Sequence, residues 1–195
     1  TANAEAWFQN DDMSTGGLVW MLREVAAESQ RVLVDGGSLL LFTDWRMLPI
    51  LAPALESAGL HYRNLITWNK GAPGMGNGFR PCHEMIIHLV KGRPNFYSHF
   101  GRNVYDVPRE PSKGRHHPTQ KPVRLMRALL EVVAPVGGHV LDPFMGGGST
   151  GLAAQELGMH FTGIERESRF VKVARERITA QAQQMTIPMT TKADK

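Results

Sequence analysis

The stretch HVLDPFMGGGSTG, which spans His139–Gly151, decides the fold of this chain together with the later segment Gly163-Ile164-Glu165. A short apolar run ends in an acidic residue, and a glycine-rich turn follows it. A helical pattern then leads to a second apolar run and a second acid. This order predicts strand, turn, helix and strand, a βαβ unit that holds a nucleotide-like ligand at its strand ends.

The bulk composition is that of one ordinary domain outside the membrane. The chain has 195 residues, 42% of them hydrophobic, and no apolar run approaches the length of a membrane span. The single cysteine, Cys82, has no partner for an internal disulfide, which favours a reducing compartment. A net charge of +4 suits a polyanionic partner but is weak support by itself.

Hydrophobic periodicity and turn residues divide the chain into alternating elements. The patterns predict helices over about 14–31, 47–58, 122–134, 149–157 and 168–183, and strands over 38–43, 60–69, 83–90, 139–142 and 160–164. The strands 60–69 and 83–90 are joined by the glycine-dense loop 71–78 without a helix, so we expect them to run antiparallel. Residues 184–195 read as a frayed tail.

The segment 93–118 has no strong period and carries basic residues interleaved with aromatic ones. It is either a solvated loop or a nucleic-acid surface, whose phosphates need positive charge and whose bases stack on rings. The candidate DNA-binding residues, one of which follows the glycine-dense loop 71–78, are Arg80, Arg93, Arg102, Arg109, Lys113, Arg115 and His116. No spacing typical of metal ligands occurs, and we expect no metal.

The glycine turn formally matches the G-x-G-x-x-G pattern of dinucleotide-binding proteins. Gly146, Gly148 and Gly151 give the match, and Glu165 follows Gly146 by 19 residues. Two features argue against a dinucleotide. The residues Asp142-Pro143-Phe144-Met145 intervene before the first glycine, and an acid at the strand end would repel a pyrophosphate. A P-loop is excluded more firmly, because a leucine stands where its lysine should follow the last glycine.

S-adenosylmethionine suits these residues better, because it has no phosphate and carries a positive amino group, a sulfonium and two ribose hydroxyls. Asp142 could hold its amino-acid end or organise the loop, Glu165 could bind the ribose, and Phe144 could lie against the sugar or the adenine. The structural alternatives are a turn-forming aspartate before proline and a glutamate that serves the start of the last helix.

Three segments in this order resemble the beta group of DNA amino-methyltransferases, which methylate adenine N6 or cytosine N4. They are HPTQKP at 117–122 with a following helix, LDPFMGGGST at 141–150 and GIE at 163–165, and the resemblance covers about residues 14–178. The segment FTDWRMLP at 42–49 further resembles the phage-associated adenine-modifying branch. The resemblance implies a permuted Rossmann-like α/β methyltransferase fold, mostly parallel with one antiparallel hairpin strand. It also implies a site-specific enzyme of a restriction-modification or phage system, located in the cytoplasm of a bacterial or phage-infected cell.

The resemblance also implies roles for individual residues. The cofactor S-adenosylmethionine would be bound by Asp142, Phe144, Gly146, Gly148, Glu165, Thr119, Lys121 and Asp44. Thr119 and Lys121 would approach its carboxylate, and Asp44 would face the same cleft from the end of the 38–43 strand. Double-stranded DNA would be the partner, with adenine favoured over cytosine, and a homodimer is a further expectation.

The implied organisation is a single methyltransferase domain over residues 1–183. It would comprise a catalytic-side half at 14–92, a DNA-contacting segment at 93–116 and a cofactor-binding half at 117–183, with the tail at 184–195.

One departure from the family pattern concerns the chemistry. The motif of Asp or Ser, Pro-Pro and an aromatic residue, which would hold the amine of a flipped base, does not occur in this sequence. We expect it upstream of Thr1, on a strand between the 38–43 and 139–142 strands, so the catalytic residues are unknown. The competing hypotheses are a catalytically silent cofactor- or DNA-binding relative, a methyltransferase acting on RNA or a small molecule, and, least favoured, a nicotinamide dehydrogenase.

Overall fold

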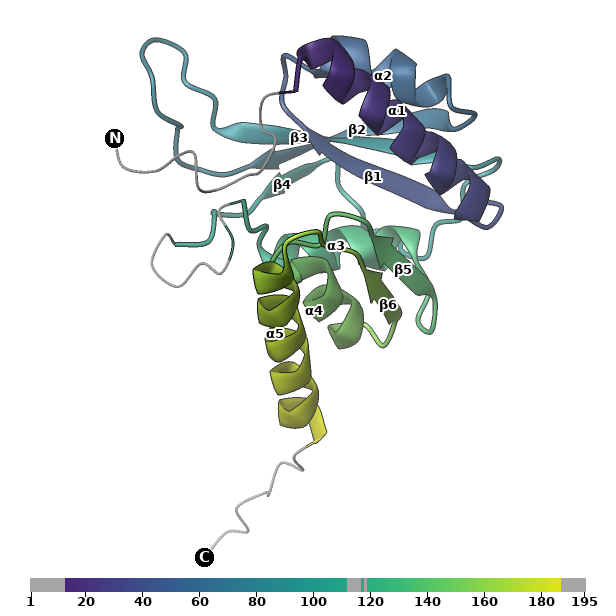
Figure 1. Cartoon of the computed structure of the whole chain (residues 1–195), viewed down its shortest axis with the longest axis vertical. Coiled ribbons are helices and arrows are strands. Elements are labelled where there is room, and N and C mark those ends of the chain that lie inside the picture. Colours follow the sequence, from purple (N-terminus) through teal and green to yellow (C-terminus); the bar gives the residue numbers. More distant parts are fainter. Residues whose placement is uncertain (1–12, 112–116, 118, 187–195) are drawn as a thin grey trace, which may run out of the picture. The chain divides into compact units, whose positions relative to one another are not determined.

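The computed structural model describes residues 13–111, 117 and 119–186, and its contacts divide the chain into two compact units (Figure 1). The first unit comprises the chain up to Arg109 together with Val132–Ala134. The second takes Glu110–Glu131 and the chain from Pro135 onward.

The first unit is a four-stranded sheet with two helices. Its elements are α1 (Thr15–Val32), β1 (Ser38–Thr43), α2 (Leu48–Glu56), β2 (His61–Asn69), β3 (His83–Val90) and β4 (Val104–Asp106). The strand order is β1-β3-β2-β4, in which β3 is antiparallel to both β1 and β2, and β4 is parallel to β2. The predicted hairpin is therefore confirmed, and β3 is the strand that opposes the other three.

Helices α1 and α2 cover one face of this sheet (Figure 1). Ser14 begins α1 as predicted, because its side-chain oxygen accepts a hydrogen bond from Gly17 N at 3.1 Å. The core between helices and sheet is aliphatic and comprises Ala26, Leu51, Leu55, Leu60, Ile87 and Leu89. Burial of these side chains packs the two helices against the sheet.

Strand β4 lies inside the segment 93–118, for which we predicted no strand. It has only three residues, too few for a periodic pattern, and it forms because β2 lies beside it. The buried side chain of Trp68 fixes the pairing, since its Nε1 donates to the Val107 carbonyl oxygen at 2.6 Å. A contact between residues far apart in the chain thus makes part of this segment a strand, although its local sequence predicts none.

The second unit contains the βαβ arrangement predicted from the glycine turn. Its elements are most of α3 (Val123–Val133), then β5 (His139–Asp142), α4 (Ser149–Glu156), β6 (His160–Gly163) and α5 (Ser168–Thr186). Strands β5 and β6 are parallel, in a register that runs from His139 opposite His160 to Asp142 opposite Gly163. Helix α5 ends at Thr186, so it runs three residues into the expected tail, and the remainder of that tail lies outside the described residues.

Within the described residues, β1 pairs with β3 alone and β5 pairs with β6 alone, in two separate sheets. The strand expected between β1 and β5 therefore stays a prediction. No helix in the described part of the chain is long and apolar enough to cross a membrane.

A buried histidine in the middle of β3 gives the first unit a pH-dependent stability. The side chain of His88 is 3% exposed and lies 3.0 Å from the Ser38 hydroxyl, measured from its Nε2 atom. Burial, with a smaller contribution from Arg63, lowers the pKa of His88 from 6.5 to about 4.

We therefore expect the free energy of unfolding to fall as the pH drops from 6.5 to 4. The unfolded chain gains a proton there that the folded chain does not bind, and the loss approaches about 3 kcal/mol near pH 4. Urea denaturation at a series of pH values measures this loss. The His88→Gln variant should show a flatter pH dependence in this window, and an unchanged slope would contradict the assignment.

Candidate functional site

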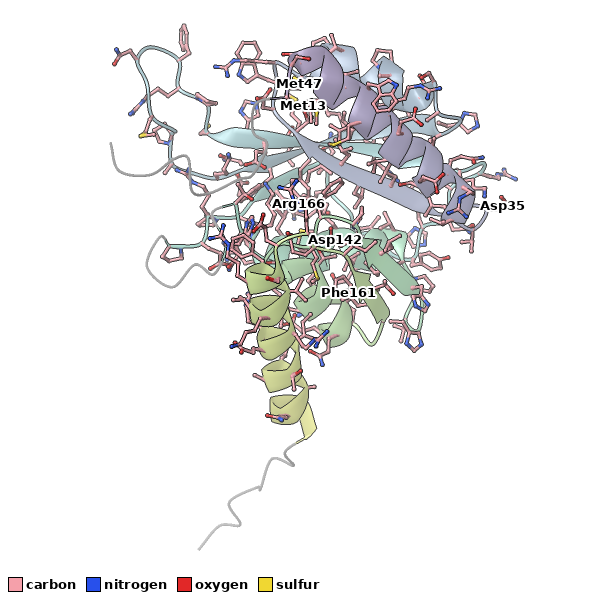
Figure 2. The ribbon with its side chains drawn as sticks, in the orientation of Figure 1. Met13, Asp35, Met47, Asp142, Phe161 and Arg166 are labelled. Carbon is pink, nitrogen blue, oxygen red and sulfur yellow. The ribbon has the colours of Figure 1, made fainter. Side chains whose placement is uncertain are left out.

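Asp142 organises the turn that follows β5 (Figure 2). Its Oδ1 accepts a hydrogen bond from Phe144 N at 3.0 Å, and its Oδ2 accepts one from the Thr150 hydroxyl at 2.6 Å. Burial raises the pKa of Asp142, and these two hydrogen bonds act in the opposite direction. The carboxylate therefore links the strand end to the first turn of α4.

Glu165 holds the same turn from the end of β6. Its Oε2 accepts a hydrogen bond from Gly146 N at 3.1 Å, while its Oε1 accepts one from Glu167 N at 2.8 Å. The backbone adds a second link, because Met145 N donates to the Ile164 carbonyl oxygen at 3.0 Å. Two carboxylates, from the ends of neighbouring parallel strands, thus flank one glycine turn.

Two glycines of this turn have backbone conformations that side chains rarely adopt. Gly146 has φ 48° and Gly148 has φ 79°. At Gly148 an added Cβ would also lie 2.8 Å from the Cβ of Ala174 on α5. The turn is therefore packed against α5 with no room for a side chain at this position.

His117 and Gln120 lie beside the glycine turn in the second unit. The His117 ring is 3.4 Å from the position that a Cβ on Gly146 would take, and it packs edge-on against Phe170 with 4.2 Å between ring centroids. Its Nδ1 lies 3.2 Å from the Thr119 hydroxyl. Burial lowers the pKa of His117, Lys121 and Arg169 lower it further, and Glu165 raises it.

The structure adds two residues that the sequence analysis did not select. Arg177 of α5 donates a hydrogen bond through Nη1 to the carbonyl oxygen of Gly147, and burial lowers its pKa. The hydroxyl of Ser149, at the start of α4, is buried and has no hydrogen-bond partner in the described part of the protein. Arg177 could have been selected from the sequence, because it follows Phe170 and Ala174 at helical spacing on the apolar face of α5.

Seven of the eight predicted cofactor residues lie in the second unit. They are Asp142, Phe144, Gly146, Gly148, Glu165, Thr119 and Lys121. Phe144 is 58% exposed, so its ring is open to a ligand. Asp44 lies in the first unit, where its Oδ1 accepts hydrogen bonds from Arg46 N at 2.8 Å and Met47 N at 3.0 Å and so shapes the turn into α2.

Four of the seven predicted DNA-binding residues lie in the described part of the first unit. Arg80, Arg93, Arg102 and Arg109 are all exposed there. Lys113, Arg115 and His116 lie outside the described residues. Across residues 13–111, 117 and 119–186, no group of three or more His, Cys, Asp or Glu side chains could hold a metal ion.

Comparison with known proteins gives one family. The sequence profile of the N6/N4 methyltransferases, described as DNA methylase, matches residues 5–176. A curated relative, the type II methyltransferase M2.DpnII of Streptococcus pneumoniae, is 28% identical over 172 residues, which cover 78% of this chain. The match spans 64% of the length of that relative.

Solved structures give the same fold. The M1.HpyAVI–SAM complex superposes with a TM-score of 0.70 and 28% identity, over 82% of each chain. The cytosine-N4-specific PvuII DNA methyltransferase superposes with a TM-score of 0.72 over 91% of this chain and 80% of its own. At 13% identity, this match concerns the fold alone.

Proposed function

Because this chain belongs to the family of N6/N4 DNA methylases, we propose that the protein transfers the methyl group of S-adenosylmethionine to the exocyclic amine of a base in DNA. Adenine N6 is the favoured acceptor over cytosine N4. The observation that carries the proposal is the pair of carboxylates, Asp142 and Glu165, on either side of the glycine turn. This chain is similar to M1.HpyAVI, whose crystal structure was solved as a complex with S-adenosylmethionine.

The donors and acceptors of the second unit suit this cofactor. Each carboxylate oxygen of Glu165 accepts one backbone N–H, which leaves lone pairs for the two ribose hydroxyls. The buried Ser149 hydroxyl, without a partner among the described residues, supplies a polar group for the amino-acid end. Gly146 and Gly148 keep the turn free of side chains, so the backbone can approach a ligand closely.

Charge also favours S-adenosylmethionine over a dinucleotide. Asp142 would attract the positive amino group or sulfonium, whereas a pyrophosphate would meet two carboxylates. Lys121, just before α3, would attract the carboxylate of the methionine moiety, with Thr119 beside it. The bound cofactor supplies a methyl group on a positive sulfur, which a neutral amine can attack. The residues described here bind and orient it, and Asp44 is proposed as a further contact from the first unit.

We propose that basic residues of the first unit bind the DNA substrate. Arg80, Arg93, Arg102 and Arg109 are exposed and can reach phosphates without the cost of breaking a buried ion pair. Lys113, Arg115 and His116 complete the proposed set. We further propose that both compact units serve one methyltransferase domain over residues 1–183, that the protein works in the cytoplasm, and that it forms a homodimer, which sedimentation would test.

Calorimetry with S-adenosylmethionine and with NAD tests the proposed function. The chain should bind the former and not the latter, and Glu165→Ala should weaken binding about 100-fold, because hydrogen bonds to a charged group are worth about 1.5–3 kcal/mol. Glu176→Ala removes a carboxylate from an exposed position on α5 and serves as the matched control. Binding of NAD alone would refute the proposal, and equal affinity of the Glu165→Ala and wild-type chains would refute the role of Glu165.

A further inference from the structure

The loop between β2 and β3, residues 70–82, carries two large apolar side chains that touch little of the protein. Phe79 and Met75 are fully exposed, with relative exposures of 107% and 99%. Figure 1 shows this loop projecting beyond the ends of the two strands. Exposed apolar side chains of this size, gathered on one loop, mark a surface that is buried against a partner.

The base of the loop is fixed by hydrogen bonds, although its tip is open. Lys70 N donates to the Cys82 carbonyl oxygen at 2.7 Å, and Gly74 N donates to the Pro81 carbonyl oxygen at 2.9 Å. The loop is therefore a hairpin extension with a defined base, which can present its tip to a partner at low entropic cost.

Side chains at the end of β2 strengthen this base. Asn69 accepts a hydrogen bond from Gly71 N at 3.0 Å through Oδ1 and donates to Asp106 Oδ1 at 2.7 Å through Nδ2. Lys70 forms a partly buried ion pair of 2.9 Å with Glu84. These contacts tie the loop to β3 and β4 as well as to β2.

The loop leaves the sheet at the edge where open α/β sheets bind their ligands. Strands β1, β2 and β4 run in the same direction, so their carboxyl ends share this edge. Val107 N donates to the Asn69 carbonyl oxygen at 3.0 Å, so the chain that leads to Arg109 leaves from the same edge. Arg80 is exposed and directly follows Phe79. This edge of the sheet thus carries the exposed ring of Phe79 and the guanidinium groups of Arg80 and Arg109.

We propose that Phe79 is a wedge that enters the base stack of duplex DNA and fills the gap left when the target base leaves the helix. This inference rests on the proposed function, because an enzyme that modifies a base amine must take the base out of the duplex. A ring stacks on bases of any sequence, and the neighbouring cation pairs with a phosphate. The partner of this surface is therefore DNA that contains a gap, and not a second protein.

An abasic site in a DNA duplex provides this gap without requiring the target sequence. Fluorescence anisotropy compares two 30-base-pair duplexes that are identical except for one abasic nucleotide. The wild-type chain should prefer the abasic duplex about tenfold, since stacking on one base is worth about 1–3 kcal/mol. Phe79→Ala should bind both duplexes equally, and Phe79→Trp should regain the preference.

Trp20→Ala is the matched control, because Trp20 on α1 is also an exposed aromatic residue of the first unit, at 67%, and lies outside the proposed DNA-contacting residues. This variant should keep the preference for the abasic duplex. Absence of the preference in the wild-type chain, its persistence in Phe79→Ala, or an equal loss in Trp20→Ala would overturn the inference. So would a change in the oligomeric state of Phe79→Ala on size-exclusion chromatography. Calorimetry with S-adenosylmethionine on the same samples separates this outcome from a failure of the proposed function, in which the wild-type chain binds no cofactor.

Discussion

Replacing Gly148 by alanine is expected to abolish measurable binding of S-adenosylmethionine and to destabilise the second unit by about 3 kcal/mol. The residue has φ 79°, and an added Cβ would lie 2.8 Å from the Cβ and 3.2 Å from the Cα of Ala174. The backbone of α5 cannot move aside as the end of a flexible side chain would, so the glycine turn must shift. Calorimetry and urea denaturation measure the two effects.

Gly137→Ala separates the steric effect from backbone strain. Gly137 lies in the same unit and has φ 74°, but a Cβ there would meet no atom within 4 Å. This control should lose about 1 kcal/mol of stability and keep its affinity for S-adenosylmethionine. If the two variants lose cofactor affinity equally, the packing of the turn against α5 is not what positions it.

Replacing Trp68 by alanine should cost about 4 kcal/mol of unfolding free energy and release β4 from the sheet. The side chain is 2% exposed, packs edge-on against Phe42 at 6.4 Å between ring centroids, and donates to the Val107 carbonyl oxygen. Its loss leaves a cavity and a carbonyl without its partner. Urea denaturation measures the stability, and hydrogen exchange at the Val107 amide reports on the pairing of β4 with β2.

Trp68→Phe is the companion variant, because it keeps a ring in the core and removes the indole N–H. It should cost about 1–3 kcal/mol, the penalty for an unsatisfied buried acceptor, and it should leave the first unit folded. Fast exchange at the Val107 amide in both variants would assign the order of β4 to the hydrogen bond. Unchanged exchange in Trp68→Ala would show that β4 does not depend on this side chain.

The helices and the longer strands could be predicted because their signals are local. Ser14 precedes an apolar helical pattern, and the runs 38–43 and 83–90 are rich enough in apolar residues to predict strands. The pairing of Asp142 and Glu165 around one turn could also be predicted, since parallel strands of a βαβ unit end at the same edge.

Other features depended on contacts between distant segments. Strand β4 exists because β2 and Trp68 lie beside it, and Arg177 reaches the glycine turn because α5 packs there. One missed feature is local: Asp44 accepts hydrogen bonds from two backbone amides at the start of α2, and the sequence analysis did not predict this cap.

By itself the sequence determined the βαβ unit, the position of the glycine turn and the family. Hydrophobic periodicity, turn residues and the order of the motifs are all properties of the linear sequence. Only the tertiary structure decided which side chains hold that turn in place and that the ring of Phe79 is fully exposed. The packing of the turn against α5 joins residues far apart in sequence, and Phe79 in the 70–82 loop is exposed because the rest of the fold leaves it uncovered. Such contacts arise when burial brings those residues together, and no local pattern encodes them.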